Sequence, residues 1–216
     1  MIRVKICGNR TIEEAFMAVR AGADAVGLIV GARYKTEDEL DTYTAGEILT
    51  ALPPYISTVL VTHLISAGEV IEIYQRVPTS VIQLQNDIMP REITKIKIHL
   101  PHVKLIKSIH VKNITAIETA KSFTPYVDAL LLDSRTGDRI GGTGITHDWD
   151  ISSKIVLQIN KPVILAGGLN PGNVLEAIRH VRPFGVDVNS GVEFADGKKD
   201  PKKINDFVRL CKNICE

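Results

Sequence analysis

Two side chains in this sequence have the type and the position to move protons, the thiol of Cys7 and the carboxyl group of Asp133. Each stands at the end of a short, largely apolar run of strand length. A thiolate acts as a base only where positive charge or oriented N–H groups lower its pKa. A carboxyl group in apolar surroundings is disfavoured in its ionised form, so it can serve as a general acid near neutral pH. The alternatives are a small buried cysteine and an aspartate that binds the next loop's backbone.

Two segments near the C-terminus offer a place for an anion. Residues 165–171 read Leu-Ala-Gly-Gly-Leu-Asn-Pro, and residues 187–192 read Asp-Val-Asn-Ser-Gly-Val. Small residues let the backbone approach a ligand, and free N–H groups at a helix start favour a dianion. We therefore expect both segments to form a phosphate site. The alternative is that each is a tight turn that requires positive φ.

Other candidate residues are weaker. The guanidinium of Arg33 follows an apolar run at residues 25–30 and could pair with a substrate carboxylate at a rim, although it could equally be solvated. A glycine-rich stretch, 134–144, follows Asp133 and is either a cover for a site or a connecting loop. The six histidines and the pair Cys211 and Cys215 lack metal-ligand spacing, so no metal site is predicted.

Eight short apolar runs are spaced as strands, and helical segments follow them. Thr11 with Glu14, and Ser66 with Glu69, have the form of capping boxes that start helices. Asp200 is a helix cap followed by proline at the first helical position. The predicted strands are Arg3–Cys7, Ala25–Val30, Thr58–Thr62, Ser80–Leu84, Val103–Lys107, Val127–Leu132, Pro162–Ala166 and Phe184–Val188.

Eight strand–helix units in 216 residues predict an α/β protein, a single (β/α)₈ TIM barrel domain over residues 1–216. Continuous apolar runs suit strands buried on both faces of a parallel sheet. A doubly wound open sheet is the second choice, because it usually has fewer strands and no G-x-G-x-x-G follows the first strand. In a parallel barrel the strand tips share one mouth, which would bring Cys7 and Asp133 together.

Composition excludes several classes of partner. The net charge of +1 gives no global field for nucleic acid or an acidic membrane, so an anion site must be local. No apolar run approaches the roughly 20 residues that span a bilayer. Three cysteines, an odd and sparse count without a secretory leader, predict free thiols and a cytoplasmic location.

Several motifs together resemble the phosphoribosylanthranilate isomerase family of tryptophan biosynthesis, nearly end to end and in family order. The matching stretches are Lys5-Ile6-Cys7-Gly8, residues 21–27, Leu131-Leu132-Asp133-Ser134, residues 141–144 with Thr146 and Asp148-Trp149, residues 165–169, and residues 185–193. The resemblance implies a (β/α)₈ barrel and an isomerase that needs no cofactor. Its partner would be a small phosphorylated sugar, bound by a monomer or a homodimer.

The resemblance also implies roles for individual residues in an Amadori rearrangement. The position of Asp133 is the family's general acid, which would protonate the furanose ring oxygen. The position of Cys7 is its general base, which would take the proton from C2. Asp187 would lie near the sugar. The phosphate would bind to three residues of the glycine-rich segments, Gly168, Ser190 and Gly191.

Three stretches depart from the family pattern, and all fall where the aromatic half of the substrate should bind. They are the shortened segment Val30–Tyr34, the sequence Gln83-Leu84-Gln85-Asn86, and Val61-Thr62-His63. The departures leave open a related barrel isomerase that acts on a phosphoribosyl amine with another aglycone. A non-catalytic phosphosugar-binding protein is a third hypothesis, against which the intact Cys7 and Asp133 weigh. A metal-dependent epimerase is disfavoured because no histidine–aspartate ligand set is present.

Overall fold

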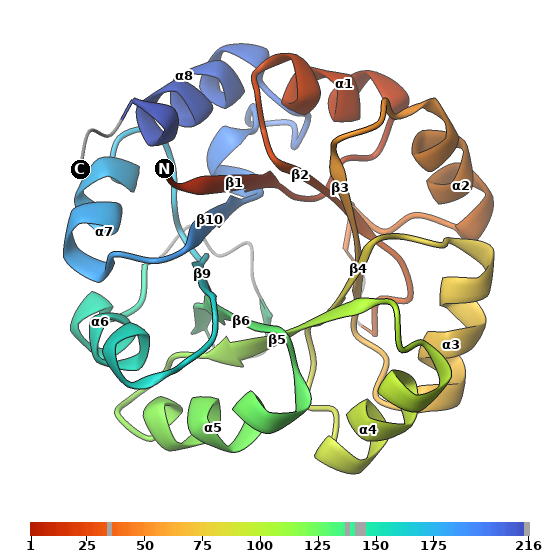
Figure 1. The fold of residues 1–216 in the computed structure, drawn as a ribbon. Coiled ribbons are helices and arrows are strands. Elements are labelled where there is room, and N and C mark those ends of the chain that lie inside the picture. Colours follow the sequence, from red (N-terminus) through yellow and green to blue (C-terminus); the bar gives the residue numbers. More distant parts are fainter. Residues whose placement is uncertain (34–35, 137–138, 141–145, 214–216) are drawn as a thin grey trace.

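Eight parallel strands close into a barrel surrounded by helices (Figure 1). The computed structural model describes residues 1–33, 36–136, 139–140 and 146–213. Neighbouring strands follow the order β1-β10-β9-β6-β5-β4-β3-β2, and β2 pairs with β1. The predicted (β/α)₈ barrel is therefore confirmed, and the open sheet is excluded. The barrel strands are β1 Arg3–Ile6, β2 Ala25–Ile29, β3 Ser57–Thr62, β4 Val81–Leu84, β5 Lys104–His110, β6 Ala129–Asp133, β9 Val163–Leu165 and β10 Gly185–Val188.

The helices form the outer ring. In the described part of the chain they are α1 Ile12–Arg20, α2 Thr42–Ala51, α3 Ala67–Arg76, α4 Pro90–His99, α5 Ala116–Phe123, α6 Trp149–Gln158, α7 Val174–Val181 and α8 Pro201–Lys212, with 3₁₀ turns η1 Thr124–Tyr126 and η2 Ser190–Val192. The cap predicted for α1 is present, since the Glu14 N–H donates to Thr11 Oγ1 at 3.1 Å. The Glu14 carboxylate accepts from the N–H of Arg10, one residue before the cap. Asp200 caps α8 by accepting from Lys202 and Lys203 N–H.

The second predicted capping box is wrong. Ser66 precedes α3 but its side chain makes no capping hydrogen bond. The N–H of Ala67 instead donates to Glu92 Oε2 at 3.0 Å, from the neighbouring helix α4. A carboxylate supplied by tertiary packing thus satisfies an N–H at the start of this helix, which local sequence could not indicate.

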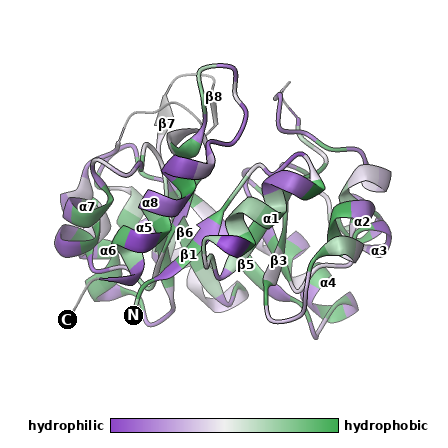
Figure 2. Cartoon of the chain, turned by 90° about the horizontal axis from the view of Figure 1, so that it is seen from above, coloured by the Kyte–Doolittle hydropathy of each residue, from purple (hydrophilic) through white to green (hydrophobic). Residues whose placement is uncertain are grey.

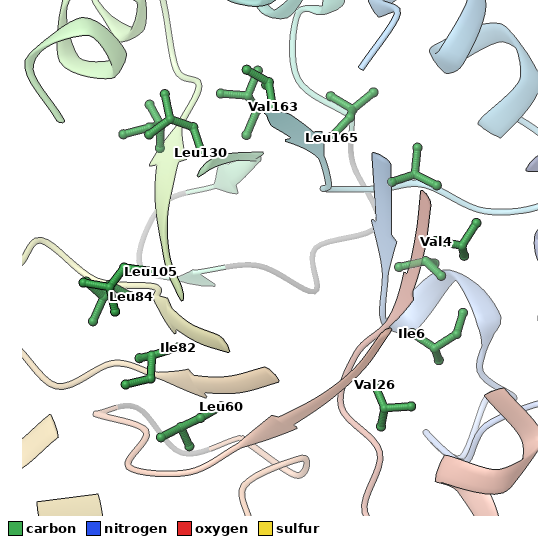
Figure 3. Packing of buried hydrophobic residues seen from close by; sticks show 14 of the residues in the cluster. Val4, Ile6, Val26, Leu60, Ile82, Leu84, Leu105, Leu130, Val163 and Leu165 are labelled. Carbon is green, nitrogen blue, oxygen red and sulfur yellow. The ribbon is translucent and has the colours of Figure 1, made fainter. Parts of the chain in front are cut away.

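Each barrel strand divides its side chains between two faces. Val4 and Ile6 point outward into the layer between strands and helices, as Figure 3 shows for these and eight further residues. Lys5, between them, points into the barrel, where its ammonium reaches Gln83 of β4. The outer layer supplies most of the core, at about 1.5–3 kcal/mol for each large aliphatic side chain. The interior of the barrel holds polar side chains such as Lys5 and Gln83 beside two smaller apolar clusters.

The carboxyl ends of the strands lie at the edge where β7 and β8 project (Figure 2). β7 Arg135–Thr136 and β8 Arg139–Ile140 form an antiparallel pair directly after β6. The stretch predicted as a glycine-rich cover or linker therefore includes a short hairpin, while 137–138 and 141–145 lie outside the described residues. Tyr34 and Cys215 also lie outside them. No helix in the described ranges is long and apolar enough to cross a membrane.

Candidate active site

One cavity of about 650 Å³ opens at the carboxyl ends of the barrel strands. Cys7 and Asp133, 126 positions apart in the sequence, both line it. The residues predicted for the phosphate and sugar also line it, namely Asp187, Gly168, Ser190 and Gly191. Arg33 is exposed after β2 and is not among the lining residues, so its binding role stays a prediction.

The backbone around Cys7 fixes its thiol in the mouth. The Cys7 N–H donates to Val188 O at 2.9 Å, which continues the β1–β10 ladder by one residue. Gly8 then takes a φ of +66°, and a Cβ there would overlap the side chain of Asn189. Gly27 on β2 makes room for the thiol, because a Cβ on it would lie 2.8 Å from Cys7 Sγ.

Opposing charges act on Cys7. Burial, together with the Asp187 carboxylate, raises the pKa of Cys7 to about 11, against the lowering influence of the Lys5 ammonium and, less strongly, of Lys199. The thiol is therefore protonated in the resting site at neutral pH. The surroundings of Cys7 therefore do not provide the lowered pKa that the sequence argument required of a thiolate base.

The pKa of Asp133 is also raised, which for an acid is the useful direction. Burial and the negative charge of Asp187 together raise it to about 6. Gln85 Nε2 donates to Asp133 Oδ2 at 2.8 Å, and this hydrogen bond lowers the pKa, as does the backbone N–H of Ser134. A carboxyl group with a pKa near 6 can hold or release a proton near neutrality, as a general acid must.

A row of polar side chains crosses the barrel interior between these two groups. Lys5 Nζ lies 2.8 Å from Asp187 Oδ2 and donates to Gln83 Oε1 at 3.0 Å. Gln83 Nε2 donates to Gln85 Oε1 at 2.8 Å, and Gln85 reaches Asp133. Sequence reasoning missed Lys5 as a site residue, and it placed both glutamines near the aromatic half of the substrate without finding this network. Their signal was the two-residue spacing, Lys5 with Cys7 and Gln83 with Gln85, which places each pair on one strand face.

The phosphate segments fold as open backbone turns. Gly167 and Gly168 have φ of +82° and +68°, the left-handed region that favours glycine. The Asn173 side chain, which precedes α7, donates to Gly168 O at 2.9 Å and holds this turn. Opposite, a Cβ at Gly191 would overlap the carbonyl oxygen of Leu169. The close approach of the two segments therefore requires glycine at position 191, and it leaves a concave backbone surface beside the cavity.

A second network, also missed from sequence, holds the rim between β10 and α8. Lys199 is buried, and its Nζ lies 2.6 Å from Glu193 Oε1 and 2.5 Å from Asn189 Oδ1. Asn189 Nδ2 donates to Asp38 Oδ2 at 2.8 Å, which joins the segment after β2 to the segment after β10. These contacts fix the backbone next to Ser190.

The cavity lining includes other ionisable side chains. In the described ranges, no group of three or more His, Cys, Asp and Glu side chains is arranged to hold a metal ion. His63, at the tip of β3, lines the cavity, and burial lowers its pKa. Cys7 and Asp133 therefore share this cavity with further ionisable side chains, among them Asp187 and His63.

Comparison with known proteins agrees with this geometry. The family model described as N-(5'phosphoribosyl)anthranilate (PRA) isomerase matches residues 4–210. N-(5'-phosphoribosyl)anthranilate isomerase 2 from Methanosarcina mazei is 43% identical over 214 residues, 98% of this chain and 95% of that protein. The enzyme of that name from Methanocella arvoryzae is 42% identical over 212 residues, 96% and 97% of the two chains.

Solved structures are similar over the same extent. Phosphoribosyl anthranilate isomerase from Thermotoga maritima has a TM-score of 0.86 at 33% identity, covering 99% of this chain and 100% of that chain. A phosphoribosyl anthranilate isomerase in complex with reduced 1-(o-carboxyphenylamino)-1-deoxyribulose 5-phosphate has a TM-score of 0.83 at 32% identity, with the same coverage. Since the family match runs almost from end to end, the chain belongs to the N-(5'-phosphoribosyl)anthranilate isomerase family.

Proposed function

We propose that this cavity catalyses the isomerisation of N-(5'-phosphoribosyl)anthranilate in tryptophan biosynthesis, with Asp133 as general acid and Cys7 as general base. The observation that carries the proposal is that both groups line one cavity beside the turns of Gly168 and Gly191. The backbone there would bind the phosphate through N–H groups. Fixing the phosphate holds the sugar between acid and base, and such fixed orientation supplies much of an enzyme's rate.

Ring opening is the step that needs the acid. Protonated Asp133 donates its proton to the furanose ring oxygen, and the C1–O bond breaks with its electron pair on that oxygen. The nitrogen lone pair forms the C1=N bond, which gives a protonated Schiff base. Asp133 is left as a carboxylate, which the hydrogen bond from Gln85 stabilises.

Proton abstraction is the step that needs the base. The Cys7 thiolate takes the proton from C2, the C–H electron pair forms the C1=C2 bond, and the C=N pair returns to nitrogen. The product of this step is a neutral enolamine. Transfer of the C2 hydroxyl proton to C1 then gives the 1-deoxyribulose 5-phosphate ketone. The iminium cation beside the thiol favours its ionised form during the reaction.

The acid–base pair of Asp133 and Cys7 must hold one proton in total in order to work. With a pKa of about 11 for Cys7 and about 6 for Asp133, the resting pair is thiol and carboxylate at neutral pH. The working pair is thiolate and carboxylic acid, which holds the same number of protons. Moving one proton converts one form into the other, so the ratio of the two forms does not depend on pH between these pKa values.

Asp187 has a position that suits a sugar hydroxyl. Its Oδ2 is bound to Lys5, and within the described part of the chain its buried Oδ1 has no hydrogen-bond partner. A buried acceptor without a donor costs about 1–3 kcal/mol, which a ligand hydroxyl would offset. We therefore assign Asp187 to the ribose portion of the substrate.

A different aglycone is the second candidate. His63 and Gln85, from two of the stretches that depart from the family pattern, both line the cavity. They lie at the tips of β3 and β4, away from the phosphate turns after β9 and β10. The relatives, which are named for anthranilate, support the first candidate.

The test uses freshly generated phosphoribosylanthranilate and follows the loss of its fluorescence. We expect turnover that falls at least about 100-fold in Cys7→Ala and in Asp133→Asn, the range for loss of one acid or base. Cys211→Ala removes another buried thiol, in α8, and should retain activity. Turnover no faster than in buffer, with phosphate esters still bound, would favour the second candidate or a non-catalytic protein.

A further inference from the structure

We infer that Gln85 is a positioning residue that fixes which oxygen of Asp133 carries the transferable proton. This inference rests on the proposed function, since it concerns the acid of that reaction. Gln85 is 6% exposed and lines the cavity. Its amide does not titrate near neutral pH, so Gln85 is not itself the acid or the base.

Lys5 determines the direction of each hydrogen bond in the row that runs through Gln83 and Gln85 to Asp133. Burial lowers the pKa of Lys5, but Asp187 and Cys7 together raise it by more, so Lys5 is an ammonium group and can only donate. The atom of Gln83 that faces Lys5 must then be its oxygen, and the Gln83 NH₂ must face Gln85. By the same logic Gln85 presents its oxygen to Gln83 and its NH₂ to Asp133. The ammonium thus orients both amides.

A third contact holds the amide of Gln85 in this orientation. Ser108 Oγ on β5 donates to Gln85 Oε1 at 2.6 Å, so this oxygen accepts two hydrogen bonds. The backbone is held as well, because Gln85 N–H donates to Thr62 O at 2.9 Å. Rotating the amide by 180° would set two NH₂ groups against each other and remove the donor from Asp133.

As a result, the two carboxyl oxygens of Asp133 differ in their hydrogen-bond surroundings. Oδ2 faces a fixed N–H donor, so a carboxylic acid proton on Oδ2 would point at another hydrogen. The Gln85 donor therefore favours Oδ1 as the protonated oxygen. That oxygen faces Gly167, since a Cβ on Gly167 would lie 2.9 Å from it. Gly167 lines the cavity beside the phosphate turn, so Oδ1 lies on the side of the carboxyl group near that turn.

Gln85 also assists the transfer itself. Counted from the working form, in which Asp133 is protonated, the hydrogen bond from Gln85 strengthens as Asp133 gives up its proton, because a hydrogen bond to an ionised carboxylate is about twice as strong as one to a neutral group. Within that form it lowers the barrier to proton transfer. The other charged groups that act on Asp133 are Asp187, which opposes its ionisation, and Lys5, which favours it. The backbone N–H of Ser134 is a further donor to this carboxyl group.

The test compares Gln85→Met with wild type over pH. We expect kcat to fall about 10- to 100-fold while KM stays within about threefold. The low-pH limb of kcat/KM should move to higher pH, because loss of the donor destabilises the Asp133 carboxylate and raises its pKa. Gln85→Met combined with Asp133→Asn should cost no more than Asp133→Asn alone, since the two residues act as a unit.

Two further variants separate this role from a structural one. Gln75→Met makes the same substitution on the exposed side of α3 and should change nothing. Ser108→Ala loosens the Gln85 amide without touching Asp133, and should lower kcat about three- to tenfold even if Gln85→Met fails to fold. Rescue of activity by Gln85→His, which restores an N–H donor, would also support the role.

Results that contradict the role of Gln85 can be distinguished from failure of the proposed function. If wild type shows no turnover, the proposed function is wrong. If wild type is active and Asp133→Asn is not, but folded Gln85→Met keeps kcat within twofold, this inference is overturned. Equal changes in kcat and 1/KM with an unmoved low-pH limb would also overturn it, as would full activity in Ser108→Ala.

Discussion

Lys5 Nζ and Asp187 Oδ2 lie 2.8 Å apart in the interior of the barrel, with side chains 6% and 9% exposed. The strand register places them there, because Lys5 is the direct partner of Asp187 in the β1–β10 ladder. The two charges act on Cys7 in opposite senses, Lys5 lowering its pKa and Asp187 raising it. The ion pair is therefore part of what sets the base strength of the thiol.

Lys5→Met should make Cys7 a weaker acid. The substitution removes the nearest cation and leaves Asp187 buried without its partner, so the pKa of Cys7 should rise. We expect the rate of Cys7 alkylation by iodoacetamide at pH 8 to fall at least tenfold, and turnover to fall about 100-fold. Stability should also fall by about 3–5 kcal/mol, the usual result of breaking a buried pair.

The control for this substitution is Lys112→Met, at an exposed position after β5. It should leave alkylation and turnover unchanged. Alkylation is measured on protein shown to be folded by circular dichroism. An unchanged alkylation rate in folded Lys5→Met would mean that Lys5 does not influence the thiol.

The pH dependence of kcat/KM should show a broad plateau. Below a pH of about 6 both Asp133 and Cys7 are protonated, so the pair holds two protons and no thiolate forms. Activity should therefore rise with pH through about 6, stay level, and fall as the pH approaches about 11, where no acid remains. Steady-state rates at low substrate concentration report these pKa values of the free enzyme. An optimum below pH 6 that declines toward pH 7 would contradict the proposed pair.

Gly191→Ala should damage phosphate binding. A Cβ at this position would overlap the carbonyl oxygen of Leu169, so the two turns proposed to bind the phosphate must separate. We expect KM to rise at least tenfold, and inorganic phosphate to inhibit correspondingly less. The measurement is competitive inhibition by phosphate in the fluorescence assay.

Gly46→Ala is the matched control for that change. Gly46 lies within helix α2, where a Cβ would meet nothing within 4 Å. This substitution should stabilise the protein by about 0.5–1 kcal/mol, because alanine loses less backbone entropy in a helix. Equal phosphate inhibition in both variants would mean that the turn at Gly191 does not contact the phosphate.

Much of the fold could be predicted because its signals are local. Apolar runs of strand length alternate with helical segments that begin at caps such as Thr11 and Asp200, and each of these caps is present. Ser66 failed as a capping box because the competing group, Glu92, comes from the next helix. The local sequence around a helix start does not reveal a hydrogen-bond partner that is about 25 residues away.

The site could be predicted only in part for a related reason. Cys7, Asp133 and the glycine turns mark strand tips, and in a closed barrel all tips meet. Gln83, Gln85 and Lys199 act through partners on other strands or loops, so their roles depend on register and side-chain direction. In strands buried on both faces, hydropathy does not reveal which residues face the interior. From the sequence alone, a lysine within such a strand is interpreted as a charge beside the site, because its partner inside the barrel is not known.

Arg33 remains the predicted partner of the substrate's carboxylate, and it can be tested independently of the phosphate cradle. It lies exposed in the segment after β2, whose neighbouring residues Glu37 and Asp38 line the cavity. A guanidinium that binds the anthranilate carboxylate contributes to substrate affinity but not to the affinity for inorganic phosphate. Arg33→Ala should therefore raise KM about 10-fold and leave phosphate inhibition within about twofold. Arg10→Ala is unsuitable as a control, because Arg10 binds Gly197 O at the rim, whereas the exposed Arg76→Ala on α3 is suitable. If Arg33→Ala weakens the binding of phosphate and of substrate equally, the arginine acts through the electrostatic field at the cavity mouth. The substrate carboxylate must then bind elsewhere.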